Sequence, residues 1–325
     1  MSRNPKLEEF EIERKPSRFQ GVRGGSDFFT RKHSTSRLFD KTPSRDRSLK
    51  DWGKLVLFYS IFYACLVVLF AICMVTFLQQ FINPRVPRLQ QEYSIIGSSP
   101  GLGFRPLPPD VRSTLIWYKG TGYDSYKYWE DQLKEFLSVY KKKGQTAGAG
   151  QNIYNCDWKR LPPPGKVCDV DIRTGYEPCI EENHFSFHKS SPCIFLKLNK
   201  IYGWRPEFYQ PNELPADMPE ELQTHIRSLS ATSNQTNMVW ITCQGETPAD
   251  KENIGPVSYL PRPGFPGYFY PYENAEGYLS PLVALHLRRP RTGIVINIEC
   301  RAWAKNIKYD RKEKMGVVHF EIMIE

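Results

Sequence analysis

The sequence predicts one membrane-spanning α-helix followed by a mainly-β, disulfide-bonded domain outside the membrane. Three observations support this fold class. A single stretch of 28 residues, Leu55 to Ile82, has no charged side chain. Six of the eight cysteines follow that stretch, and so do 23 of the 26 prolines. These prolines separate short β-branched runs, a pattern typical of strands joined by turns.

The segment before the apolar stretch carries most of the excess positive charge. Residues 1–54 contain 14 Lys and Arg against 8 Asp and Glu, whereas residues 83–325 contain 30 against 27. Residues 1–54 also have little apolar periodicity, so we expect a disordered, basic tail on the cytoplasmic side. Because the large domain is close to neutral, we expect no nucleic-acid partner.

Residues 55–82 are long enough to cross a bilayer. At about 1.5 Å per residue they reach roughly 40 Å, more than the hydrocarbon core of roughly 30 Å. A cleaved signal peptide needs a shorter apolar run close to residue 1, whereas 54 residues precede this one. Six Lys and Arg lie within residues 35–54 and two within residues 83–102. This asymmetry predicts a signal anchor with its N-terminus inside, the type II orientation.

The cysteines agree with this topology. Cys65 and Cys73 lie within the span, and the other six follow it. An even number of cysteines in an oxidising compartment suggests three bridges, for which 15 pairings are open. The N-glycosylation acceptor Asn234, in Asn-Gln-Thr, also lies on the outer side. The six outer cysteines are Cys156, Cys168, Cys179, Cys193, Cys243 and Cys300.

Two helices are predicted beyond the membrane. Residues 83–113 are rich in Gly and Pro and are expected to form an extended linker to a domain at 114–325. From Ser125 to Lys143 apolar side chains recur with helical spacing, which indicates one buried stripe. A shorter amphipathic helix is expected from Met218 to Leu229. The stripe of the first helix consists of Trp129, Leu133, Phe136, Leu137 and Tyr140.

The remaining apolar runs alternate as strands do. Cys243 shares a strand face with Val239 and Ile241, and Cys300 shares one with Ile296 and Ile298. We therefore expect Cys243 and Cys300 to bridge two sheets of an immunoglobulin-like sandwich. Pairing Cys156 with Cys168, and Cys179 with Cys193, would close short loops. The expected strands are 114–119, 193–198, 237–243, 282–287, 293–303 and 317–324.

Three motifs suggest enzymes, but their surroundings favour other interpretations. Gly97 to Gly101 matches G-x-S-x-G, yet it lies in a Pro-rich linker without the strand and helix that a nucleophile elbow requires. Asp40-Lys41-Thr42-Pro43 resembles the phosphorylation motif of P-type pumps, but it lies in the tail. Asp169 and Asp171 resemble the metal-binding pair of lumenal glycosyltransferases, whose fold needs alternating strands and helices.

A metal site is also disfavoured. His184 and His188 have the spacing of zinc ligands on a helix, but Pro178 and Pro192 bracket them in a cysteine-bounded loop. No third and fourth ligand converge with them in the sequence, so we interpret both as surface histidines. We therefore expect no catalytic residue, no metal and no cofactor. The chain is predicted to bind a partner rather than to catalyse a reaction.

Several longer motifs carry a family resemblance. They are FYSIFYACL with Tyr59 and Tyr63, SPGLGFRP at 99–106, KLNKIYGWRP at 197–206, the aromatic segments 268–272 and 278–284, and CRAWAKNI at 300–307. Residues 48–325 thereby resemble the β subunits of Na⁺/K⁺- and H⁺/K⁺-transporting P-type ATPases, most closely the invertebrate nervana-type branch. This chain departs from the pattern in its long tail, its single glycan acceptor and its short connection between Tyr272 and Tyr278.

The resemblance implies a sequential pairing of the six outer cysteines. It also implies a non-catalytic plasma-membrane subunit that supports folding, membrane delivery and K⁺ handling of a catalytic α subunit. Tyr59 and Tyr63 lie on one helical face beside Ser60 and Ala64, and the partner helix implied there belongs to that subunit. A small single-span regulatory subunit would be a further partner. The alternatives are a cell-adhesion or junction-organising protein and a lumenal glycosyltransferase.

Overall fold

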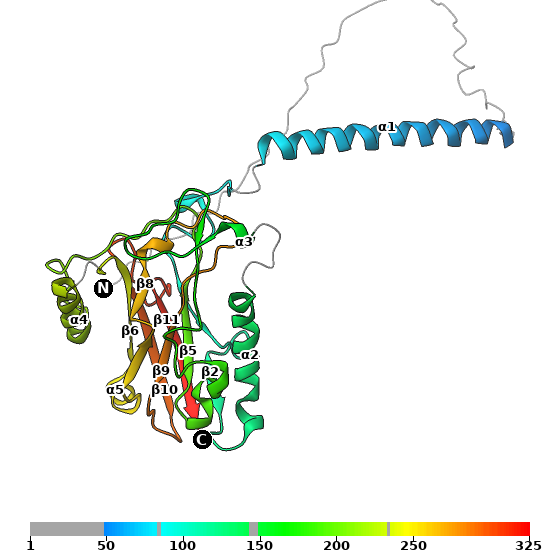
Figure 1. Cartoon of the computed structure of the whole chain (residues 1–325). Coiled ribbons are helices and arrows are strands. Elements are labelled where there is room, and N and C mark those ends of the chain that lie inside the picture. Colours follow the sequence, from blue (N-terminus) through cyan, green and yellow to red (C-terminus); the bar gives the residue numbers. More distant parts are fainter. Residues whose placement is uncertain (1–48, 83–85, 143–148, 233–234) are drawn as a thin grey trace, which may run out of the picture. The chain divides into compact units, whose positions relative to one another are not determined.

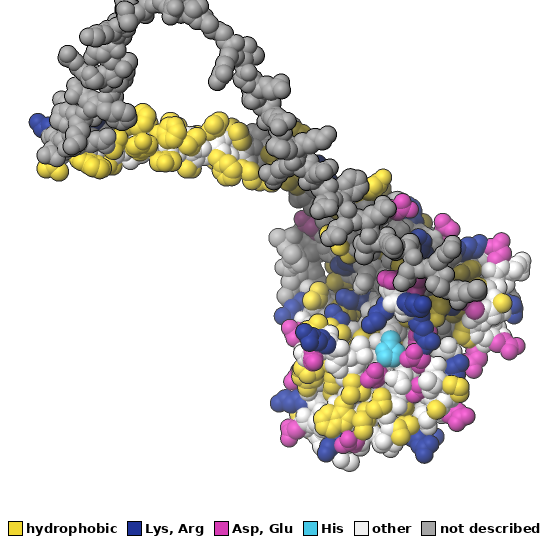
Figure 2. Space-filling model, turned by 180° about the vertical axis from the view of Figure 1, so that it is seen from behind, with side chains coloured by type: hydrophobic (Ala, Val, Ile, Leu, Met, Phe, Trp, Pro, Cys, Tyr) yellow, Lys and Arg dark blue, Asp and Glu magenta, His cyan; other side chains and the backbone are white. Residues whose placement is uncertain are grey.

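The computed structural model describes residues 49–82, 86–142, 149–232 and 235–325. The expected tail, apart from residues 49–54, lies outside these ranges. Helix α1 (Leu49–Phe81) contains nearly all of the expected span and begins six residues before it (Figure 1). None of its side chains is buried, and hydrophobic side chains cover its length (Figure 2). It is the one helix in the described residues that is long and apolar enough to cross a membrane.

The domain after the helix is a sandwich of two sheets (Figure 1). The first sheet is antiparallel, with the strand order β1 (Leu102–Arg105), β5 (Cys193–Leu198), β9 (Val283–Leu287) and β7 (Val257–Leu260). The second has the order β2 (Leu115–Tyr118), β11 (Val317–Ile324), β10 (Val295–Trp303), β6 (Met238–Gly245) and β8 (Gly264–Pro266). Only β2 in this sheet runs parallel to its neighbour, β11. A separate parallel pair joins β3 (Ile153–Tyr154) to β4 (Val167–Cys168).

The core between the sheets includes one face of β11, which lies within the strand predicted at 317–324. Phe320, Ile322 and Ile324 of β11 are buried, whereas His319, Glu321 and Met323 on the other face are half-buried. The ring of Phe320 stacks on Phe104 of the opposite sheet at a centroid distance of 5.0 Å. The mainly-β sandwich is therefore confirmed.

Strand β1 lies inside the segment that we expected to be a linker. Leu102 and Phe104 are buried, and the strand pairs with β5 from Leu102↔Leu198 to Arg105↔Phe195. The prediction of a linker through residue 113 is therefore wrong for these residues. The Gly and Pro residues around β1 are strong turn signals, so the sequence favoured a linker over a strand of only four residues.

Both predicted helices are present, with small differences in their bounds. Helix α2 (Tyr123–Lys141) buries Trp129, Leu133, Leu137 and Tyr140 and lies against β1. Helix α4 (Glu220–Thr232) packs Leu222 and Ile226 against Trp240 and Trp303 on the outer face of the second sheet. The shorter elements are α3 (Ala149–Asn152), α5 (Pro248–Asn253) and the 3₁₀ turns η1 (Gln91–Tyr93), η2 (Glu181–Lys189) and η3 (Gly267–Phe269).

Three disulfides cross-link the domain, and they have the sequential pairing that the resemblance implies. They join Cys156 to Cys168, Cys179 to Cys193 and Cys243 to Cys300. The last bridge does not connect two sheets as expected. Cys243 in β6 lies directly opposite Cys300 in β10, two neighbouring strands of the same sheet, with their Cα atoms 4.0 Å apart. The apolar faces were predicted correctly, but facing the same core does not distinguish neighbouring strands from opposed sheets.

Candidate partner-binding surfaces

The first surface is the aromatic face of α1. Tyr59 and Tyr63, one helical turn apart, stack with a centroid distance of 6.2 Å. Phe58 and Phe62 form a second stacked pair beside them, with centroids 6.3 Å apart. All four side chains are exposed on the helix. The helix thus presents an aromatic ridge to its surroundings, and contact with a partner helix remains a prediction.

The second surface combines two sequence segments that are far apart in the chain. Tyr202 forms a β-bridge with Tyr272, and the N–H of Gly203 donates a hydrogen bond to the carbonyl of Tyr272. The ammonium of Lys200 lies 5.3 Å from the ring centroid of Tyr272 and 5.2 Å from that of Tyr278. These distances are in the range of cation–π attraction. The motif at 197–206 therefore lies beside the aromatic segment 268–278.

Buried tyrosines fix the chain that follows this aromatic segment. The hydroxyl of Tyr140 donates to the carbonyl of Ser280 at 3.0 Å, and that of Tyr176 donates to the carbonyl of Leu282 at 2.8 Å. Burial raises the pKa of both phenols, so they remain protonated donors at neutral pH. These two hydrogen bonds, one of them from α2, thereby fix Ser280 and Leu282, which follow Tyr278 closely in the chain.

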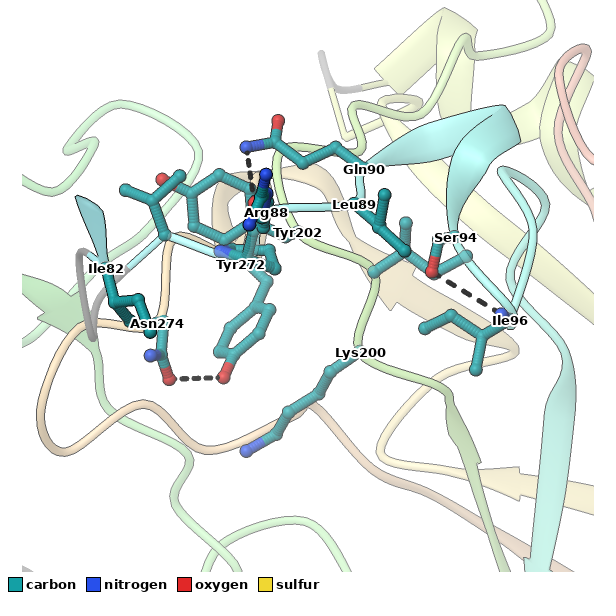
Figure 3. Close-up of a pocket in the computed structure, with 13 residues that line it drawn as sticks. Ile82, Arg88, Leu89, Gln90, Ser94, Ile96, Lys200, Tyr202, Tyr272 and Asn274 are labelled. Carbon is teal, nitrogen blue, oxygen red and sulfur yellow. Dashed lines mark hydrogen bonds between the residues drawn. The ribbon is translucent and has the colours of Figure 1, made fainter. Parts of the chain in front are cut away.

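A cavity of about 500 Å³ adjoins Lys200 (Figure 3). Residues that follow the membrane helix, including Arg88, Leu89 and Ile96, line it together with Lys200 and Tyr272. The hydroxyl of Tyr272 donates to the side-chain oxygen of Asn274 at 2.8 Å, which fixes the tyrosine ring at the cavity wall. Contact with surrounding protein lowers the pKa of Lys200 through desolvation, although its side chain stays partly exposed.

The residues of the enzyme-like motifs have structural partners. The hydroxyl of Ser99 accepts a hydrogen bond from the backbone N–H of Lys308. The carboxylate of Asp171 accepts one from the N–H of Arg173, which closes a turn two residues long. Neither geometry resembles a nucleophile with its base or a metal-binding pair. The motif at residues 40–43 lies outside the described residues.

The two histidines also lie in a structural cluster. Nδ1 of His184 is 3.1 Å from each carboxylate oxygen of Glu130, a buried side chain that also pairs with Lys134 at 2.7 Å. His184 has a left-handed backbone, so the two histidines do not share an α-helix. Their ring centroids are 5.6 Å apart. Within the described ranges, no group of three His, Cys, Asp or Glu could hold a metal ion.

Sequence reasoning missed the importance of Lys200 and Glu130. Lys200 lies in a motif that we used only for family resemblance, and its contact with Tyr272 depends on chain crossings that periodicity does not reveal. Glu130 lies on the buried side of α2, because it is one helical turn before Leu133 and two turns before Leu137. Its charge made it look like a surface residue. The expected glycan acceptor Asn234 lies outside the described residues.

The fold and these surfaces define a class: a membrane protein with one candidate span in its described residues and a disulfide-bonded β-sandwich that presents aromatic and cationic surfaces. The chain belongs to the sodium/potassium ATPase beta chain family, whose model matches residues 38–320. It is 59% identical to sodium/potassium-transporting ATPase subunit beta-2 of Drosophila melanogaster over 283 residues, 86% of this chain and 87% of that protein.

More distant relatives match over a similar span. Identity to subunit beta-1 of Drosophila melanogaster is 39% over 282 residues, which cover 86% of this chain and 88% of the relative. Identity to human subunit beta-2 is 26% over 292 residues, with 86% and 88% covered. The similarity therefore includes both the membrane helix and the domain, and the resemblance inferred from the motifs is confirmed.

Proposed function

We propose that this chain is the non-catalytic β subunit of a Na⁺/K⁺-ATPase. In this role it supports the folding of the catalytic α subunit, its delivery to the plasma membrane and its handling of K⁺. The observation that carries the proposal is the family match over residues 38–320, which includes α1 and most of the sandwich. ATP hydrolysis belongs to the α subunit in this proposal, so the chain needs no nucleotide site.

The proposed orientation is type II, with a cytoplasmic N-terminus. The six Lys and Arg within residues 35–54 and the two within residues 83–102 support it through the positive-inside rule. The three disulfides agree, because such bridges persist in oxidising compartments. Asn234 is then in the lumen or outside the cell, where it is a glycosylation site in this proposal. An increase in electrophoretic mobility after N-glycosidase removes the glycan, absent in Asn234→Gln, would test this assignment.

Two contacts with the α subunit follow from the described surfaces. Tyr59 and Tyr63 offer an aromatic ridge in the membrane, where close packing rather than the hydrophobic effect drives helix association. The tyrosine-rich segment 268–278 offers a surface outside it, and hydrogen bonds from Tyr140 and Tyr176 fix the residues just after this segment. Rigid aromatic side chains are favoured in interfaces because they lose little entropy on binding. A small single-span regulatory subunit is a further proposed partner of the complex.

Purification from native membranes in a mild detergent tests this proposal. A tagged chain should retain a multi-span P-type ATPase in a one-to-one ratio, identified by mass spectrometry. The alternative proposal, a cell-adhesion or junction-organising role, predicts instead that the chain aggregates coated beads or cells without such a partner. Stoichiometric recovery of a septate-junction or adhesion protein, with no ATPase, would favour that alternative. Hydrolysis of a nucleotide sugar by the purified chain would favour the glycosyltransferase.

A further inference from the structure

The cavity beside Lys200 combines two cations with an apolar wall (Figure 3). Lys200 and Arg88 both line it, and neither forms an ion pair with a carboxylate among the described residues. Glu92 is the acidic residue of the segment 86–96, and it does not line the cavity. Leu89 and Ile96 supply apolar surface on the same wall. The site thus suits a molecule that is anionic at one end and apolar at the other.

Part of the cavity wall is close in sequence to the membrane helix. Val86, which lines it, is five residues after Phe81, the last residue of α1. Five residues reach at most about 18 Å, even when fully extended. The headgroup zone adds roughly 5 to 8 Å to each side of the hydrocarbon core. The wall of the cavity therefore begins within reach of the phospholipid headgroups.

The segment that forms this wall exposes an unusual amount of apolar surface. Ile95 is fully exposed, Tyr93 is 84% exposed and Ile96 is 63% exposed. Adjacent apolar side chains with such exposure mark an interaction site more often than a surface that faces water. Tyrosine beside cationic residues is typical of the membrane–water interface. These side chains fit a lipid surface better than they fit bulk solvent.

We propose that this cavity binds the headgroup of a phospholipid from the outer leaflet. Lys200 and Arg88 contact the phosphate, because ammonium and guanidinium groups form charge-assisted hydrogen bonds with phosphate oxygens. Leu89 and Ile96 contact the glycerol and upper acyl region. Tyr272 holds Lys200 in position through its ring, 5.3 Å from the ammonium. A free phosphate ion would leave the apolar half of the cavity unused, so the lipid is the better fit.

Photo-crosslinking in the assembled complex tests this inference. The complex is reconstituted in nanodiscs that contain a phosphatidylcholine with a photoreactive group in the headgroup, and labelled peptides are mapped by mass spectrometry. Label is expected on residues 86–96 and 200–202. Lys200→Gln and Arg88→Gln should each reduce it about tenfold, the effect of losing one charged hydrogen bond. Lys200→Arg should retain it. Lys312→Gln, in an exposed turn outside the cavity, is the matched control.

Three results would overturn the inference. Equal labelling of the parent chain and both Gln variants would show that the cations do not bind the headgroup. Loss of the label on addition of inorganic phosphate would identify a free-anion site instead. Labelling of the isolated chain without labelling of the complex would show that a partner protein, rather than lipid, fills the cavity. Because the α subunit is recovered in each assay, these outcomes are distinguishable from failure of the proposed function.

Discussion

The hydroxyl of Tyr259 accepts a hydrogen bond from the backbone N–H of Cys243 at 2.7 Å. Tyr259 belongs to β7 in the first sheet and Cys243 to β6 in the second, so this bond joins the two layers. The neighbouring strand β8 pairs with β6 only from Met238 to Trp240. The tyrosine therefore supplies a partner for a backbone group beyond the end of that pairing, while the disulfide of Cys243 acts within one sheet.

Tyr259→Phe should destabilise the domain by about 1 to 3 kcal/mol, because it leaves the N–H of Cys243 buried without a partner. Denaturant unfolding of the purified full chain, followed by tryptophan fluorescence, measures this loss. Tyr309→Phe is the matched control, since the hydroxyl of Tyr309 is on an exposed side chain and makes only a 3.5 Å contact with Glu299. Equal stability of the two variants would contradict the role given to Tyr259.

Alkaline pH should destabilise the fold through the same side chain, because the deprotonated phenol is charged and buried. Burial raises the pKa of Tyr259 to about 12, above its value of about 10 in an unfolded chain. The folded state therefore holds the proton longer, so this contribution is complete below pH 10 and is lost as the pH rises towards 12. The slope is about 1.4 kcal/mol per pH unit for one group. Tyr259→Phe should show a shallower decline between pH 10 and 12, whereas an unchanged slope would exclude this titration.

The sequence predicted the elements that have strong local patterns. Strand β11 and the stripe of α2 follow from periodicity alone, because the spacing of apolar residues within a short segment predicts which face of a strand or helix is buried. Strand β1 and the contact between Lys200 and Tyr272 could not be found in this way. Both depend on pairing between distant segments, and β1 is too short for its alternation to stand out among turn residues. The sequence also predicted wrongly that the Cys243–Cys300 bridge joins two sheets. The order of strands within a sheet depends on long-range pairing, which local periodicity does not reveal.

Removal of the Cys243–Cys300 bridge should strongly destabilise the domain. The two cysteines are 57 residues apart, and closing such a loop stabilises by about 4 kcal/mol on the chain-entropy model. The double variant Cys243→Ala/Cys300→Ala avoids a free thiol and should accumulate in the endoplasmic reticulum. Sensitivity of its glycan to endoglycosidase H measures this retention. Cys65→Ala, which removes a cysteine without a disulfide, should behave as the parent chain; normal export of the double variant would be contrary to expectation.

Phe320→Ala should cost about 3 to 5 kcal/mol as a large-to-small core change. The side chain is fully buried and stacks on Phe104, so its loss opens a cavity between the sheets. Surface biotinylation should then find less of the α subunit at the cell surface, with unchanged ATP hydrolysis per assembled pump. Met323→Ala, on the half-buried outer face of β11, is the control. Normal surface levels with Phe320→Ala would argue against dependence on a folded sandwich.

Co-expression with an ATPase α subunit tests the central claim most directly. Surface α and K⁺-activated ATP hydrolysis are measured with the parent chain, with Tyr59→Leu/Tyr63→Leu, and without the chain. The parent chain should raise both quantities well above the level without it. The double variant keeps α1 apolar but removes the stacked ridge, so it should still insert while α assembly or K⁺ activation changes. Surface α and K⁺ activation that are the same with and without this chain would contradict its assignment as the β subunit.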